Sequence, residues 1–139
     1  MQAFVWPVRV YYEDTDAGGV VYYANYLKFM ERARTEWLRT RGLEQDVLLK
    51  EQDLVFAVRS LSIDYIRPAR LDDLLQVRVT VSKLRRASIV FEQTINRVHN
   101  SESEDILTIG QVKVVSLAAT SFKPKPIPLT LRKDLEHAG

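Results

Sequence analysis

Apolar and polar residues alternate along five segments of the chain, a period of two that is typical of β-strands with one buried face. The first segment runs from Phe4 to Tyr12. Its Pro7 favours an edge position in a sheet, because proline cannot donate a ladder hydrogen bond. The other four segments are Leu61–Tyr65, Leu75–Val81, Ser88–Val98 and Leu107–Leu117. Short polar connections join the last three, so we expect these three strands to form an antiparallel meander.

One stretch between the first two predicted strands has a longer period. Its apolar residues recur every three or four positions, which places them on one face of an α-helix of about five turns. They are Tyr26, Phe29, Met30, Ala33, Trp37 and Leu38, and Gly42 follows them as a helix-ending signal.

Together these patterns predict an α+β fold with a single domain over residues 1–139, in which an antiparallel sheet of about five strands wraps around one long central helix. This is a hotdog-like arrangement, because the helix can bury its apolar stripe only against the concave face of the sheet. One helix covers only part of such a sheet. We therefore expect a second copy to bury the remaining apolar surface, in a homodimer or homotetramer.

The charge balance limits the possible partners. The chain has 20 basic and 18 acidic residues, a net charge of +2, which argues against nucleic acid as a partner. It contains no cysteine, which excludes disulfides, thiolate metal sites and a cysteine nucleophile, and which favours a cytoplasmic location. No run approaches the roughly 20 apolar residues of a membrane span, so none is expected.

Histidine is also scarce. The two histidines, His99 in a polar turn and His137 near the C-terminal end, argue against a histidine-based triad or a clustered metal site. The segment from Asp14 matches a calcium loop only in part, because Asn25 stands where a bidentate glutamate is needed. We therefore expect no metal or other cofactor, and carboxylates have to carry any acid–base chemistry.

The segment from Tyr11 to Tyr26 holds three carboxylates, two adjacent glycines and several aromatic residues, immediately ahead of the predicted helix. Gly18 and Gly19 let the backbone turn tightly and leave the first N–H groups of the helix free, so an oxygen with negative charge can bind there. Asp16, beside those donors, could attack a carbonyl group or activate water. By spacing alone, a turn or helix-capping aspartate is the commoner role for such a residue.

Neighbouring tyrosines and two arginines also allow two interpretations each. Tyr22 and Tyr23 are more often core or interface aromatics than reagents. The adjacent Arg85 and Arg86, in a predicted turn, are usually a solvated pair, although two guanidinium groups also suit a phosphate. The segment 67–70 is a weaker candidate of the same kind.

Residues 6–22 and 31–36 resemble the 4-hydroxybenzoyl-CoA thioesterase family of hotdog proteins, and they are most similar to its Tol-Pal-associated acyl-CoA thioesterase branch. The most specific part is the motif Asp-Thr-Asp-Ala-Gly-Gly-Val-Val at residues 14–21. The resemblance continues through further segments, so that it covers nearly the whole chain: 66–73, 86–91 and 123–126. It implies hydrolysis of acyl-CoA thioesters, and it leaves acyl carrier protein open as a second carrier of the substrate.

The resemblance also implies roles for individual residues, and it favours the catalytic interpretation of Asp16. In this family the second aspartate of the motif, here Asp16, is the nucleophile or the general base. The backbone N–H at the helix start, here that of Tyr23, polarises the carbonyl group. The similar branch usually carries histidine at this position, but a backbone donor survives the change. The expected substrate-binding residues are Gly18, Gly19 and Tyr22, with Arg85 and Arg86 holding the CoA phosphates.

Two other functions remain open at this point. A non-catalytic acyl-binding or scaffold protein of the hotdog fold would use Asp16 only as a cap. A hotdog dehydratase ranks last, because such enzymes normally pair a histidine with an acid, and neither His99 nor His137 lies near the predicted helix start. The acyl length and the choice between dimer and tetramer are not fixed by the residues.

Overall fold

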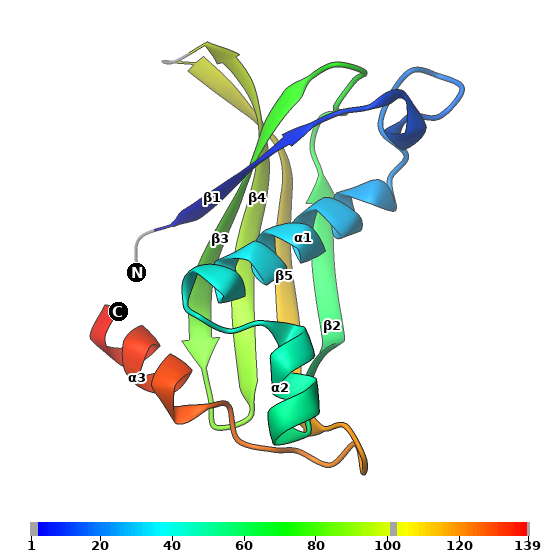
Figure 1. Ribbon diagram of the computed structural model, residues 1–139. Coiled ribbons are helices and arrows are strands. Elements are labelled where there is room, and N and C mark those ends of the chain that lie inside the picture. The colour runs from blue at the N-terminus through cyan, green and yellow to red at the C-terminus, as the bar shows by residue number, and fades with distance from the viewer. Residues whose placement is uncertain (1–2, 101–102, 139) are drawn as a thin grey trace.

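Five strands form one antiparallel sheet in the computed structural model, which describes residues 3–100 and 103–138. The strands are β1 (Phe4–Arg9), β2 (Leu54–Tyr65), β3 (Leu74–Leu84), β4 (Ser88–Asn100) and β5 (Ser103–Ala118). Their order across the sheet is β1-β3-β4-β5-β2 (Figure 1). The five predicted strands are confirmed, and β3, β4 and β5 form the predicted meander.

The two edge strands differ in length from their predictions. Among the described strands β1 pairs with β3 alone, as Pro7 predicts for an edge. It ends at Arg9, because the chain then leaves the sheet for a short 3₁₀ turn, η1 (Tyr12–Asp14). β2, at the other edge, begins at Leu54 instead of Leu61, since β5 is long enough to pair with the added residues.

The described residues contain three α-helices, α1 (Asn25–Thr40), α2 (Gln45–Gln52) and α3 (Leu129–Ala138), so the prediction of one long helix alone is wrong. α1 carries the predicted stripe and is followed by Gly42, whose φ of 76° suits glycine. α2 was not predicted, because Leu48 is its only buried residue and the helix therefore has no apolar stripe. α3 buries Leu131 and Leu135. None of the described helices is both long and apolar enough to cross a membrane.

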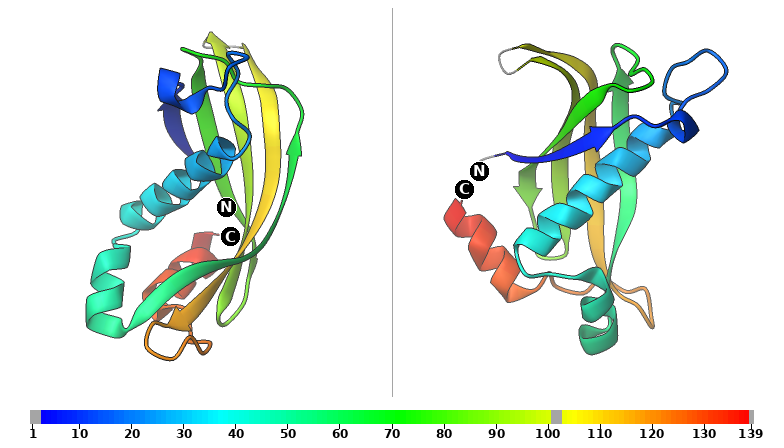
Figure 2. Two further views of the ribbon diagram at one scale, coloured as in Figure 1. Left: turned by 90° about the vertical axis from the view of Figure 1, so that its right-hand side faces the viewer. Right: turned by 45° about the horizontal axis from the view of Figure 1, so that its top comes forward.

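α1 lies against the concave face of the curved sheet (Figure 2), and the predicted stripe residues are buried there. Trp37 packs edge-on against Phe91 of β4, with the ring centroids 5.3 Å apart. Gly110 of β5 gives room to Met30, because a Cβ added at this glycine would lie 3.1 Å from Met30 Cε. The close fit fixes the position of α1, and with it the position of the segment that precedes the helix.

A buried polar contact adds to this apolar packing. Gln93 of β4 is fully buried, and its Nε2 donates to the Met30 carbonyl oxygen at 3.0 Å. Its Oε1 accepts a hydrogen bond from Arg34 Nη1 at 2.9 Å. Burial lowers the pKa of the Arg34 guanidinium, an effect that Glu31 opposes. Gln93 thus links two successive turns of α1 to the centre of the sheet.

Candidate active site

A tight loop between η1 and α1 carries Asp16. Thr15 and Val21 pair across the base of this loop, and the Asp16 N–H donates to the Val20 carbonyl at 2.9 Å. The Gly19 N–H closes the turn by donating to the Asp16 carbonyl at 3.1 Å. Gly19 has a φ of 77°, a conformation that glycine adopts without the steric cost of a Cβ. The predicted tight turn at the glycines is therefore present.

The Asp16 side chain is exposed and is held by its own loop. Its Oδ1 accepts a hydrogen bond from the Gly18 N–H at 2.8 Å. Within the described residues Oδ2 accepts none, so it is free to meet a substrate or water. Asp16 does not cap α1, because the residue in the N-cap position is Ala24. The turn interpretation of Asp16 is thus correct in part, and it leaves one carboxylate oxygen available.

The segment between β2 and β3 supports this loop. The Val21 N–H donates to the Ala69 carbonyl at 2.9 Å, and Val20 forms a bridge with Arg70. The Ala69 N–H donates to the Tyr26 hydroxyl oxygen at 2.9 Å. The backbone of Ala69 therefore holds both the loop, through Val21, and the first turn of α1, through Tyr26.

α1 begins at Asn25, so Tyr23 lies two residues ahead of the first helical residue rather than at it. The Asn25 N–H donates to the Tyr22 carbonyl, and the Tyr22 N–H donates to the Asp14 carbonyl, at 2.9 and 3.0 Å. The Tyr23 N–H has no acceptor among the residues that the structure describes. It is a free donor next to the positive end of the helix dipole, an arrangement that suits an oxyanion.

Four tyrosines gather around this donor. The rings of Tyr22 and Tyr23 have centroids 4.8 Å apart, and Tyr65 meets Tyr23 and Tyr26 edge-on, at 6.3 and 5.3 Å. Burial is the largest cause of the raised pKa of Tyr26. Three of these tyrosines, Tyr23, Tyr26 and Tyr65, line a hollow of about 250 Å³. The other residues that line it are Val21, Ile66, Arg67 and Pro68. The sequence pattern did not single out Tyr65, because it is the last residue of an ordinary strand.

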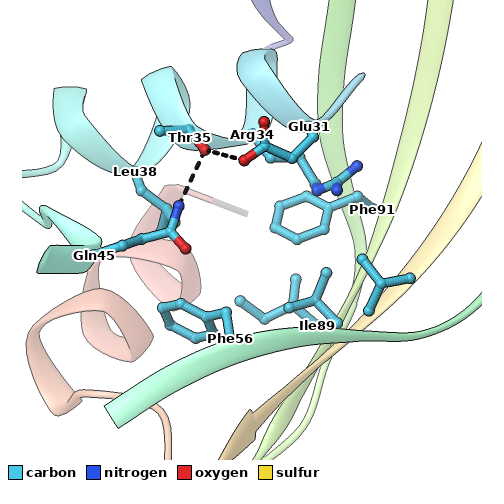
Figure 3. A pocket seen from close by; sticks show the side chains of 10 residues that line it. Glu31, Arg34, Thr35, Leu38, Gln45, Phe56, Ile89 and Phe91 are labelled. Atoms are coloured by element: carbon cyan, nitrogen blue, oxygen red, sulfur yellow. Dashed lines mark hydrogen bonds between the residues drawn. The ribbon is translucent and has the colours of Figure 1, made fainter. Parts of the chain in front are cut away.

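A second cavity, of about 100 Å³, lies between α1 and the sheet (Figure 3). One side is a polar chain in which Gln45 Nε2 donates to Thr35 Oγ1, which in turn donates to Glu31 Oε1, each at 3.0 Å. The lining combines this chain with mainly apolar side chains from the helix and strands: Glu31, Arg34, Thr35, Leu38, Gln45, Phe56, Val58, Ile89, Phe91 and Val114. No pattern in the sequence marked these residues as a group.

The two candidate phosphate-binding arginines lie far from Asp16 within one protomer. Arg85 and Arg86 form the turn between β3 and β4, where the Arg85 N–H donates to the Ser88 carbonyl at 2.9 Å. This turn and the Asp16 loop lie at opposite ends of the sheet (Figure 1). β3 separates the two ends, and 11 residues of strand span roughly 35 Å. A single chain does not bring these arginines to the carboxylate.

The described residues contain no group of three or more histidine, cysteine or acidic side chains that could hold a metal ion. His99 pairs instead with Asp105 across the β4–β5 hairpin, with 2.6 Å between Nε2 and Oδ2. This hydrogen bond is the main cause that lowers the pKa of the Asp105 carboxyl. The side chain of His137 lies outside the described residues.

Comparison with known proteins shows to which family the chain belongs. Residues 18–103 match the sequence profile of a family described as the thioesterase superfamily. The chain belongs to the thioesterase superfamily. Among its relatives in this superfamily is the acyl-CoA thioesterase YbgC of Haemophilus influenzae, which is 48% identical over 134 residues, 96% of this chain and 95% of the relative.

Solved structures of the superfamily agree with this fold. A probable thioesterase from Bartonella henselae is 35% identical, and the match covers 91% of this chain and 100% of that chain with a TM-score of 0.82. A 4-hydroxybenzoyl CoA thioesterase variant, complexed with 4-hydroxybenzoyl CoA, has a TM-score of 0.87 over 96% of this chain and 98% of that chain. At 18% identity this second likeness shows the fold alone, and the fold is the hotdog thioesterase fold.

Proposed function

We propose that this protein is an acyl-CoA thioesterase in which Asp16 acts on the thioester and the Tyr23 N–H binds the carbonyl oxygen. The observation that carries the assignment of residues is that two groups on the segment ahead of α1 are free. One oxygen of the exposed Asp16 carboxylate is unoccupied, and the Tyr23 N–H is unpaired among the described residues. A carboxylate and an oxyanion donor are the two groups that thioester hydrolysis requires.

Two chemical routes use this pair. In the nucleophilic route, an Asp16 oxygen bonds to the thioester carbonyl carbon, the C–S bond breaks, and CoA leaves as a thiolate. Water then hydrolyses the mixed anhydride and regenerates the carboxylate. In the general-base route, Asp16 takes a proton from a water molecule whose oxygen attacks the carbonyl carbon directly; the C–S bond then breaks, and the CoA thiolate leaves and takes up the proton. In both routes negative charge develops on the carbonyl oxygen, where one preorganised donor is typically worth about 100- to 1000-fold in rate.

The substrate is held by more than one copy of the chain in this proposal. Gly18 and Gly19 have no side chains to obstruct the approach to Asp16, and the exposed Tyr22 flanks it. Arg85 and Arg86 would take the CoA phosphates of a substrate bound at another protomer, because β3 separates them from Asp16 in their own. The same phosphopantetheine arm presented by acyl carrier protein would reach the site equally.

The free edge of the sheet supports a homo-oligomer. β2 pairs with β5 alone, which leaves the other side of this 12-residue strand without a partner strand among the described residues. Apolar side chains on it and just beyond it are exposed: Val58, Leu61, Tyr65 and Ile66. A long edge with exposed apolar residues favours pairing with a second copy. The cytoplasmic location expected from the sequence stays a prediction.

The test of the catalytic assignment is the Asp16→Asn variant. Asparagine keeps an oxygen for the Gly18 N–H, so the loop is preserved while the negative charge is lost. We expect the turnover number to fall at least about 100-fold, with little change in KM, because a reacting group is removed and binding groups remain. The measurement is thiol release from short, long and aromatic CoA esters.

Glu13→Gln is the matched control, because Glu13 is an exposed carboxylate in the same segment. Its turnover should equal that of the unmodified protein. Full turnover in Asp16→Asn would contradict the assignment of Asp16. Binding of the esters without release by either protein would instead indicate the non-catalytic acyl-binding alternative.

A further inference from the structure

We infer that Tyr65 is a positioning residue for the oxyanion donor, which it holds through a hydrogen bond to the Tyr23 carbonyl group. This inference rests on the proposed function, because Tyr23 is the donor there. Tyr65 is the last residue of β2 and lies 42 positions from Tyr23 in the sequence. Its hydroxyl group donates to the Tyr23 carbonyl oxygen at 3.0 Å.

This hydrogen bond is one of two that fix Tyr23, one on each side. The peptide group between Tyr22 and Tyr23 contains the proposed donor, and its carbonyl oxygen accepts the Asn25 N–H at 2.9 Å. The next peptide group, between Tyr23 and Ala24, is held by the Tyr65 hydroxyl. With both peptide planes fixed, the φ and ψ angles of Tyr23 are fixed, and so is the direction in which its N–H points.

Tyr23 needs such support because little else holds it. It precedes the N-cap residue Ala24, so it lies outside the hydrogen bonds of α1, and 62% of it is exposed. Tyr65 connects this exposed segment to β2, which is paired with β5 along its length. The donor is thereby anchored to a paired strand of the sheet. A catalytic donor is effective only where its direction is set before the reaction.

The surroundings of Tyr65 suit a permanent hydrogen-bond donor. Its ring meets those of Tyr23 and Tyr26 edge-on, at interplanar angles of 88° and 68°, and these contacts help to orient the phenol. Partial burial, with smaller effects of Tyr23 and Tyr26, raises the pKa of Tyr65. A raised pKa favours the protonated hydroxyl group, which is the form that can donate to the Tyr23 carbonyl.

The first test is Tyr65→Phe, which keeps the ring contacts and removes only the hydroxyl group. We expect kcat to fall roughly 3- to 30-fold with KM within about twofold, because the donor becomes less well aimed while the binding groups remain. Tyr12→Phe is the matched control, since Tyr12 is 83% exposed, and both of its kinetic constants should stay unchanged. An unchanged kcat in Tyr65→Phe overturns the inference. So does a raised KM with full kcat, which would show that the hydroxyl group binds substrate.

A second test gives a signature that packing alone cannot produce. Replacement of Tyr65 by 3,5-difluorotyrosine lowers the pKa of the phenol while its shape is almost kept. We expect kcat to fall with rising pH as this phenol loses its proton, at a lower pH than any such fall in the unmodified protein. A profile identical to that of the unmodified protein overturns the inference.

A third measurement needs no turnover and separates the inference from the proposed function. Backbone ¹⁵N order parameters of rigid segments are about 0.85, and we expect those of Tyr23 and Ala24 to fall in Tyr65→Phe but not in Tyr12→Phe. Unchanged order parameters overturn the positioning role even in an active thioesterase. If they fall as expected but no CoA ester is hydrolysed by the unmodified protein, the proposed function fails and the anchoring of the Tyr23 donor stands.

Discussion

Two adjacent glycines have different tasks in the loop that carries Asp16. Gly19 provides the backbone conformation, with a φ of 77°, and nothing lies within 4 Å of where its Cβ would be. Gly18 provides room, because a Cβ at this position would lie 3.3 Å from Asp16 Oδ1. One glycine is needed for its φ angle and the other for the space beside the carboxylate.

Alanine substitutions should separate these tasks. Gly18→Ala should lower kcat roughly 3- to 10-fold with little loss of stability, because its Cβ displaces the Asp16 carboxylate by a few tenths of an ångström. Gly19→Ala should lower the free energy of unfolding by about 1–2 kcal/mol, the cost of a left-handed conformation in an L-residue. Urea denaturation and thiol release measure the two effects. Equal loss of stability in both variants would contradict this division.

Among the elements, the contact between α1 and β4 decides where the site is built. The apolar stripe of α1 sets the position of the helix on the sheet, and the hydrogen bonds of Gln93 to Arg34 and to the Met30 carbonyl add a directional constraint at one point of it. Because the Asp16 loop and Tyr23 come directly before α1, a shift of the helix would move both. The buried amide thus connects the interior to the site.

Gln93→Leu should lower the free energy of unfolding by about 1–3 kcal/mol, because the Arg34 guanidinium is left partly buried without its acceptor. Gln111→Leu is a suitable control, since Gln111 is exposed on β5 and its substitution should change stability little. Chemical denaturation of both variants gives the comparison. A loss in Gln93→Leu no greater than that in the control would show that the buried hydrogen bonds do not hold α1.

The whole molecule has its two proposed substrate-binding regions at opposite ends of one sheet. Asp16 lies at one end and the Arg85–Arg86 turn at the other, with the length of β3 between them (Figure 1). The uncovered edge of β2 runs between the same two ends. An assembly through this edge would bring surfaces of different protomers together, so activity and oligomerisation should be linked.

Leu61→Lys should therefore produce a smaller assembly and a weaker enzyme. Leu61 is 43% exposed near the middle of β2, and a charge on an edge strand disfavours pairing with another strand. Light scattering coupled to gel filtration should show a dimer or larger assembly for the unmodified protein and a monomer for the variant. Leu49→Lys on α2, at 45% exposure, is the control and should leave the assembly intact. A fully active monomeric protein would rule out the linked model of binding.

Local pattern was enough to predict the five strands, the stripe of α1 and the turn at Gly18 and Gly19, because each depends on the conformational preferences of residues close together in the chain. The resemblance of residues 14–21 to known thioesterases then pointed to Asp16. α2 and α3 were missed, since α2 buries only Leu48 and α3 is a short helix held by its contacts with the rest of the molecule, such as the ion pair between Arg41 and Asp134.

Other features depend on contacts between distant parts of the chain, and no local period records them. Tyr65 reaches the Tyr23 carbonyl because β2 ends beside the start of α1, an encounter set by strand register and helix packing. The cavity beside Glu31 exists only where α1 and three strands leave a gap between their side chains. The distance from Asp16 to Arg85 and Arg86 follows from the direction and length of β3. Neighbours in sequence determined the five strands and α1, whereas packing between distant segments determined which side chains meet.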